Sequence, residues 1–168
     1  MMKQFSKILD MIESVVKFFI AASFIVMVFA MIYQVILRYI FSASNIWSEE
    51  LSCFLFAYII MLGAGIATRK GSHLQVDFLI NLLKPKGKCI VTIISTFAGI
   101  CFLVFFGYHA IILCESTANS ISTGLKLPMT YVYASLPIGA VLMILSSIEV
   151  ILKNVDTIKN IERQGGDA

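Results

Sequence analysis

Long uncharged runs dominate the pattern of hydrophobic and polar positions along the chain. They predict membrane-spanning helices at about residues 18–38, 47–68, 89–114 and 128–149. A helix rises about 1.5 Å per residue, so about 20 residues cross the roughly 30 Å hydrocarbon layer of a membrane. The runs do not alternate with a period of two, as barrel strands of about 10 residues would. We therefore predict an all-α, integral membrane four-helix bundle.

Two further segments show helical amphipathicity but are unsuited to crossing a membrane. Residues 3–17 have apolar positions at helical spacing and charges on the other side, which predicts an interfacial lead-in helix that runs into the first span. Residues at about 75–84 carry a polar stripe, which predicts a second interfacial helix. The polar residues 150–168 are expected to form a cytoplasmic tail. The whole of 1–168 is then one membrane domain.

The composition agrees with a chain that lies mostly in lipid. It is 59% hydrophobic and only 14% charged, with a mean hydropathy of +0.91, which is too apolar for a soluble domain of this length. The net charge of +3 does not indicate a nucleic-acid partner, because the basic residues flank apolar runs and do not cluster on one soluble face. Membrane lipid is the expected environment.

The distribution of basic residues predicts the orientation. Apart from Arg38 and Lys126, every Lys and Arg precedes the first span, lies between the second and third, or follows the fourth. Because basic loops stay in the cytoplasm, we predict that both termini are cytoplasmic. Arg38, Trp47 and the polar loop from Glu115 to Lys126 should then face outward.

No catalytic or cofactor motif is visible, so we predict no enzyme activity, cofactor or metal site. The sequence contains no CxxC, HExxH, GxSxG or P-loop pattern. The cysteines are expected to be small buried hydrophobes, with a Cys53–Cys114 disulfide as the alternative. The few polar side chains within spans, Gln34 and His109, are expected to form interhelical hydrogen bonds, with a proton relay as the alternative for His109.

Two adjacent carboxylates, Glu49 and Glu50, open the second span and allow three interpretations. They could form an ion-binding or proton-coupling site. They could instead complement the helix dipole and pair with Arg38 across the short loop. One of them could also face a partner protein. Later in the same span, Gly63 and Ala67 lie four residues apart, a small-residue pair that permits close helix contact.

A family resemblance rests on the two ends of this second span. Trp47-Ser48-Glu49-Glu50 opens it, and Arg69-Lys70-Gly71-Ser72-His73-Leu74-Gln75-Val76-Asp77 follows it. With four spans, this order resembles the small membrane subunit (Q component, DctQ-like) of tripartite ATP-independent periplasmic (TRAP) transporters. The motif likeness covers only about residues 45–77.

The resemblance implies a small, non-catalytic subunit of the bacterial inner membrane. It implies a large multi-span membrane subunit as a separate chain and a periplasmic substrate-binding protein as partners. The small subunit would brace the large one and help dock the binding protein during sodium-coupled uptake of an organic acid, of the sialic acid or C4-dicarboxylate type. The rival hypothesis is a self-sufficient four-span transporter or channel with Glu49 or Glu50 as its coupling site.

The sequence thus gives a set of residues expected at partner interfaces or in structural contacts. They are Arg38, Trp47, Glu49, Glu50, Gly63, Ala67, His73, Asp77, Glu115 and Lys126. The transported acid and the helices that face the large subunit are not encoded in these patterns.

Overall fold

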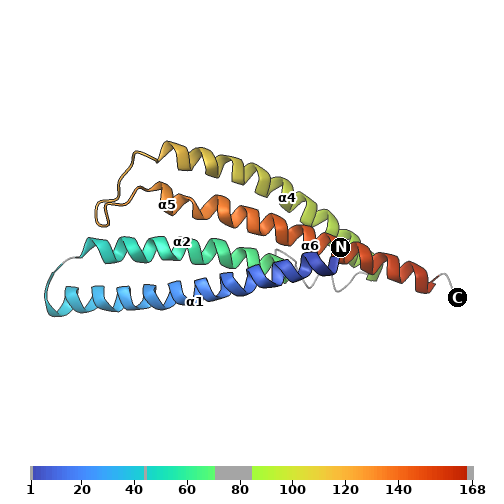
Figure 1. The fold of residues 1–168 in the computed structure, drawn as a ribbon, viewed down its shortest axis with the longest axis horizontal. Helices are drawn as coiled ribbons and strands as arrows, with labels where there is room; N and C mark the ends of the chain where they lie inside the picture. Colours follow the sequence, from blue (N-terminus) through green and yellow to red (C-terminus); the bar gives the residue numbers. More distant parts are fainter. Residues whose placement is uncertain (1, 44, 71–84, 166–168) are drawn as a thin grey trace.

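The computed structural model of the chain describes residues 2–43, 45–70 and 85–165. These residues form helices and connecting loops, without any named strand, as Figure 1 shows. The helices are α1 (Met2–Ile40), α2 (Ile46–Arg69), α4 (Pro85–Ser116), α5 (Thr130–Tyr133) and α6 (Ser135–Gly165). The predicted all-α class is confirmed.

Four segments within these helices are long and apolar enough to cross a membrane. They are Leu9–Ile40, Ile46–Arg69, Cys89–Ser116 and Thr130–Ile158. The four predicted spans are therefore confirmed as helices of sufficient length and hydropathy. Both termini lie toward the same end of the molecule (Figure 1). Their location on the cytoplasmic side stays a prediction from the charge distribution.

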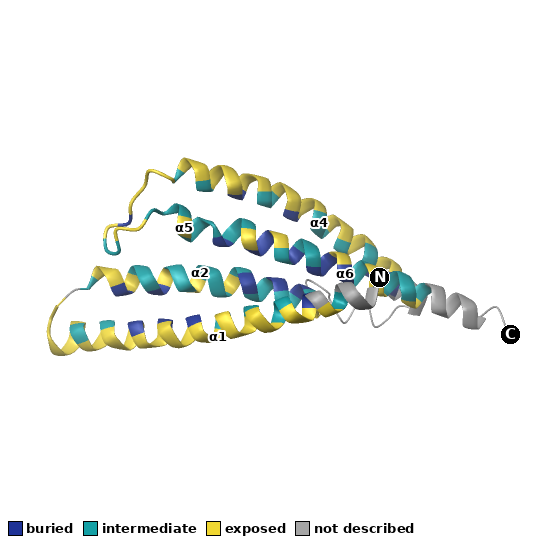
Figure 2. Ribbon diagram, viewed as in Figure 1, coloured by how far each residue is buried: buried dark blue, intermediate teal, exposed yellow. Residues whose placement is uncertain are grey.

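The helices form an open row in which each packs mainly on its neighbour. Among the described residues, α1 packs on α2, α2 on α6 and α6 on α4, so α1 and α4 lie at the edges (Figure 1). An open row encloses little interior. No more than 39% of the apolar window of any span is buried inside the chain, and exposed residues cover much of α1 and α4 in Figure 2, whereas α2 and α6 are mostly half-buried or buried. Lipid or another protein must cover these apolar faces.

The predicted lead-in is continuous with the first span. α1 runs without a break from Met2 to Ile40. Polar side chains of its first turns contact α2, as described below, whereas Met11, Val15 and Phe18 are exposed. Ion pairs thus hold the polar side of the lead-in against α2. The helix does not break at residue 17, so the lead-in and the first span share one axis.

The fourth span is interrupted at its beginning. α5 ends at Tyr133 and α6 begins at Ser135, two residues before Pro137. Proline has no backbone N–H, so Pro137 fits the first turn of α6. It cannot donate the hydrogen bond to the Tyr133 carbonyl that would join α5 and α6 into one helix. The Tyr58 hydroxyl donates to the carbonyl of Tyr131 at 2.5 Å, and the Ser135 hydroxyl donates to that of Val132 at 2.8 Å. These bonds occupy carbonyls beside the break.

The other end of α6 also differs from the predicted boundaries. The helix continues to Gly165 through most of the predicted tail. The predicted interfacial helix at about residues 75–84 lies outside the described residues, as do His73 and Asp77.

Two glycines allow α2 and α6 to approach closely. A Cβ atom on Gly139 would lie 2.7 Å from the Cβ of Met61, and one on Gly65 would lie 3.0 Å from the Cβ of Leu142. The sequence pointed instead to Gly63 with Ala67. Residues two apart on a helix point about 200° apart, and a Cβ on Gly63 would meet nothing within 4 Å. Within this chain, close packing therefore uses Gly65 and not Gly63.

Replacing Gly139 by Ala should destabilise the fold, because the added methyl group would force α2 and α6 apart. Overpacking of this kind costs about 1–3 kcal/mol. We expect a lower thermal unfolding temperature in detergent for Gly139→Ala. Gly99→Ala is the matched control, because a Cβ at Gly99 in α4 meets nothing within 4 Å. Equal unfolding temperatures for the two variants would contradict the close contact.

Candidate functional site

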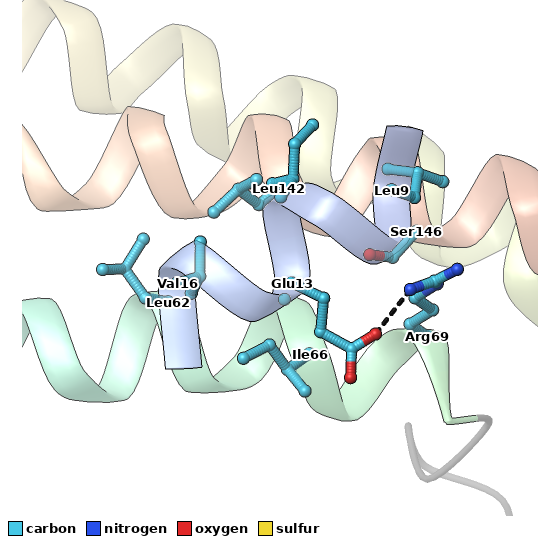
Figure 3. A pocket seen from close by; sticks show the side chains of 10 residues that line it. Leu9, Glu13, Val16, Leu62, Ile66, Arg69, Leu142 and Ser146 are labelled. Atoms are coloured by element: carbon cyan, nitrogen blue, oxygen red, sulfur yellow. Dashed lines mark hydrogen bonds and ion pairs between the residues drawn. The ribbon is translucent and has the colours of Figure 1, made fainter. Parts of the chain in front are cut away.

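Arg69, the last residue of α2, binds acidic side chains from two other helices. Its Nε donates to Glu149 of α6 at 2.5 Å, its Nη1 to Glu13 of α1 at 2.5 Å, and its Nη2 to Asp10 of α1 at 2.6 Å. Nη2 also donates to the carbonyl of Ser6 at 3.2 Å. We call these five residues the Arg69 cluster. It joins α1, α2 and α6 at the end of the molecule where the termini lie (Figure 1), and Figure 3 shows the ion pair between Glu13 and Arg69.

The charges of the Arg69 cluster are compensated within the chain. The side chains of Arg69 and Glu149 are only 9% and 4% exposed, whereas that of Asp10 is 65% exposed. Lys17 pairs with Glu13 at 2.6 Å, and Lys153 pairs with Glu149 at 2.8 Å. Three basic groups thus face three acidic groups. Buried charges require such pairing, because removal of water otherwise costs several kcal/mol per ion.

A small pocket lies between α1, α2 and α6 beside this cluster (Figure 3). Apart from Glu13, Arg69 and Ser146, its lining consists of Gly65 and hydrophobic side chains. Its volume of about 20 Å³ has room for about one water molecule. This pocket is too small for an organic acid.

Replacing Arg69 by Gln should strongly destabilise the packing of α1 and α6 on α2. Removing one partner of a buried ion pair costs about 3–5 kcal/mol, because the remaining carboxylates lose their counter-charge. We expect Arg69→Gln to unfold at a much lower temperature in detergent. The neighbouring exposed Lys70 provides the control Lys70→Gln, which should unfold like the unaltered protein. Asp10→Asn should cost less than about 1 kcal/mol, because Asp10 is largely exposed. A stable Arg69→Gln protein would contradict this role.

At the opposite end of the molecule, Glu50 binds the loop between α4 and α5. Its carboxylate accepts hydrogen bonds from the backbone N–H groups of Thr123 at 3.1 Å, Gly124 at 3.0 Å and Leu125 at 2.9 Å. The Thr123 hydroxyl donates to it at 2.8 Å. We call these four residues the Glu50 cluster. Successive N–H groups of this kind form a preferred site for an anion.

The loop is shaped to reach Glu50. Ser122 donates its N–H to the carbonyl of Leu127 at 2.9 Å, and Met129 donates to that of Ser120 at 2.8 Å, which closes a narrow turn. A Cβ on Gly124 would lie 2.9 Å from the backbone N and Cα of Trp47. Only glycine fits this approach. The predicted polar loop is therefore an ordered structure attached to the start of α2.

Removing the charge of Glu50 should release this loop. A hydrogen bond to a charged group contributes about 1.5–3 kcal/mol, so Glu50→Gln should speed hydrogen exchange at the amides of Thr123, Gly124 and Leu125 roughly ten- to hundredfold. Glu49→Gln is the matched control, because among the described residues Glu49 makes no hydrogen bond with the loop and its donor is Gln34. Unchanged exchange in Glu50→Gln would show that the carboxylate does not hold the loop.

The structure separates the two adjacent carboxylates. Glu49 is exposed and receives only a long contact, 3.5 Å, from the Nε2 of Gln34. Among the described residues, Arg38 is exposed and pairs with neither Glu49 nor Glu50. The interpretation that pairs these carboxylates with Arg38 therefore has no support among the described residues. For Glu50 the physical reason is that the N–H groups of the loop already satisfy its carboxylate.

The other residues that the sequence singled out lie in different environments. The ring of Trp47 lies 5.8 Å from that of Tyr33 of α1, and Glu115 and Lys126 are exposed. His109 is exposed on α4 and contacts the ring of Phe105 at 4.4 Å on the same helix. Its predicted interhelical hydrogen bond is absent among the described residues. All four cysteines are free.

The sequence patterns did not single out the partners in either cluster. Asp10, Glu13 and Glu149 each lie near the same predicted end of a span as Arg69, which is the signal that could have linked them. Nothing in the loop sequence beyond Gly124 marks it as a ligand for Glu50. Among the described residues, no group of three His, Cys, Asp or Glu side chains could hold a metal ion.

The row of apolar helices, with its charged clusters at the two ends, defines a small multi-pass membrane protein. A family model of the DctQ component of tripartite ATP-independent periplasmic transporters matches residues 27–157. The chain therefore belongs to the family of DctQ components, the small permease subunits of TRAP transporters. The family is a transporter subunit and not an enzyme.

Named relatives agree with this family. The chain is 26% identical to the sialic acid TRAP transporter small permease protein SiaQ of Vibrio cholerae, over 88% of this chain and 84% of that protein. It is also 26% identical to the C4-dicarboxylate small permease protein DctQ of the same organism, over 83% and 70%. With the sialic acid permease protein SiaT of Haemophilus influenzae it shares 31% identity over 77% of this chain, but it spans only 21% of SiaT.

Proposed function

We propose that this chain is a bracing subunit of a TRAP transporter in the bacterial inner membrane. It holds a large, separate transport subunit in place and helps dock a periplasmic substrate-binding protein. The complex takes up an organic acid together with sodium ions. Relatives named for sialic acid and for C4-dicarboxylates support an acid of one of these types.

The observation that carries this proposal is the open row of helices with paired charges at its ends. The Arg69 cluster joins three helices, and the Glu50 cluster fixes the opposite end. The row encloses little interior, and the pocket beside Arg69 has room for about one water molecule. This arrangement favours a rigid subunit that packs against another membrane protein. It is less suited to a subunit that encloses a conduction path.

The longer relatives support a large partner. The chain matches about a fifth of SiaT and about a fifth of the isethionate TRAP permease protein DctMQ of Oleidesulfovibrio alaskensis. In those proteins a unit like this one is covalently joined to a much longer permease. A separate small subunit would make the same neighbour contacts without the covalent link.

The rival proposal, a self-sufficient transporter with Glu49 or Glu50 as its coupling site, has less support. Four donors from the loop occupy the Glu50 carboxylate. Glu49 lies near the start of α2 and is exposed.

Reconstitution into liposomes tests whether transport requires both membrane subunits. With a sodium gradient and the binding protein present, uptake of sialic acid or of a C4-dicarboxylate should require both membrane subunits. This chain alone should give no uptake above empty liposomes, because its described helices form an open row with little interior. Uptake by this chain alone would refute the bracing role, and full uptake by the large subunit alone would show that bracing is dispensable.

A further inference from the structure

One face of α2 stays uncovered, although α1 and α6 pack on its other sides. It consists of residues spaced alternately four and three apart, the spacing of a helix-pairing seam. They are Glu49, Cys53, Phe56, Ile60, Gly63 and Ala67, of which the first four are exposed and the last two half-buried. We call these six residues the α2 strip. It is about 27 Å long at 1.5 Å per residue, nearly the thickness of the hydrocarbon layer.

The α2 strip has both an apolar part and a space for a close neighbour. Phe56 and Ile60 are 53% and 45% exposed. A Cβ on Gly63 would meet nothing within 4 Å, so this glycine is not used in packing within the chain. In membranes, small residues at four-residue spacing allow another helix to approach the backbone closely. Gly63 and Ala67 provide that arrangement on the uncovered face.

Glu49 gives the strip an unmatched charge at one end. Among the described residues it has no basic partner, and its contact with Gln34 is long at 3.5 Å. A second copy of this chain would not satisfy it. Two copies share one orientation in the membrane, so a symmetric pair would place both Glu49 carboxylates at the same depth, facing each other. Like charges in that arrangement repel.

We propose that the α2 strip binds a transmembrane helix of the large subunit, which carries a basic side chain level with Glu49. This inference rests on the proposed function. Charge complementarity at Glu49 selects an unlike partner, and Gly63 with Ala67 lets the two helix backbones approach. The exposed faces of α1 and α4, at the edges of the row, are left to lipid or to weaker contacts.

The test is co-purification of a co-expressed, tagged large subunit in mild detergent. Gly63→Leu fills the space on the strip and should lower the amount of large subunit recovered at least tenfold. Gly99→Leu is the matched control, since Gly99 of α4 has equally open surroundings, and it should retain the partner. Neither variant should unfold at a lower temperature than the unaltered chain, because neither position packs within it and leucine favours a helix more than glycine does.

The outcomes distinguish this inference from the proposed function. If the unaltered chain recovers no large subunit, the proposed function fails. If the unaltered chain recovers it and Gly63→Leu recovers as much, or if Gly99→Leu loses it equally, the assignment to the α2 strip is overturned.

Photo-crosslinking provides a second, direct readout. A benzoylphenylalanine at Ile60 should form an adduct with the large subunit, whereas one at the exposed Ile94 of α4 should not. An adduct of two small subunits from Ile60 would assign the strip to a second copy. Absence of any protein adduct from Ile60 would assign it to lipid. Either result overturns the proposal.

Discussion

The structure depends on the pairing of Arg69. A guanidinium at the end of a membrane helix has few ways to avoid the cost of losing water, and here three carboxylates from α1 and α6 surround it. In an open row each helix packs mainly on its neighbours, so an ionic connection that joins three of them helps to fix their positions. The pairing also explains the polar side of α1 near its beginning, because Asp10 and Glu13 face Arg69 and do not face water alone.

The Glu50 cluster performs a comparable task with different chemistry. No basic side chain faces this carboxylate among the described residues. Backbone N–H groups of one tight turn bind it instead, and Gly124 allows the turn to reach the backbone of Trp47. Together the two clusters fix both ends of α2, one through α1 and α6 and the other through the loop before α5. The positions of α1, α6 and the loop before α5 thus all depend on contacts with α2.

The sequence predicted those features that depend on local pattern. Uncharged runs gave the four spans, because length and hydropathy are properties of each segment by itself. It could not give the partners of Arg69 and Glu50, since these bonds join residues 56 to 80 positions apart or depend on backbone groups that have no sequence signature. For the same reason the sequence pointed to the pair Gly63 and Ala67 and did not single out Gly65: both glycines are small, and only the positions of α1 and α6 decide which one faces inward.

Gly63 has a further meaning once the arrangement of the helices is known. α2 needs one small position toward α6, which Gly65 provides against Leu142. A second small pair on the opposite side adds nothing to the fold of this chain, and glycine inside a helix costs about 1 kcal/mol relative to alanine. An uncompensated cost of this size is expected where another backbone must approach. The uncovered side of α2, with Glu49 at one end and Gly63 near the other, is therefore better explained by a partner helix than by lipid, which gains nothing from the absence of a side chain.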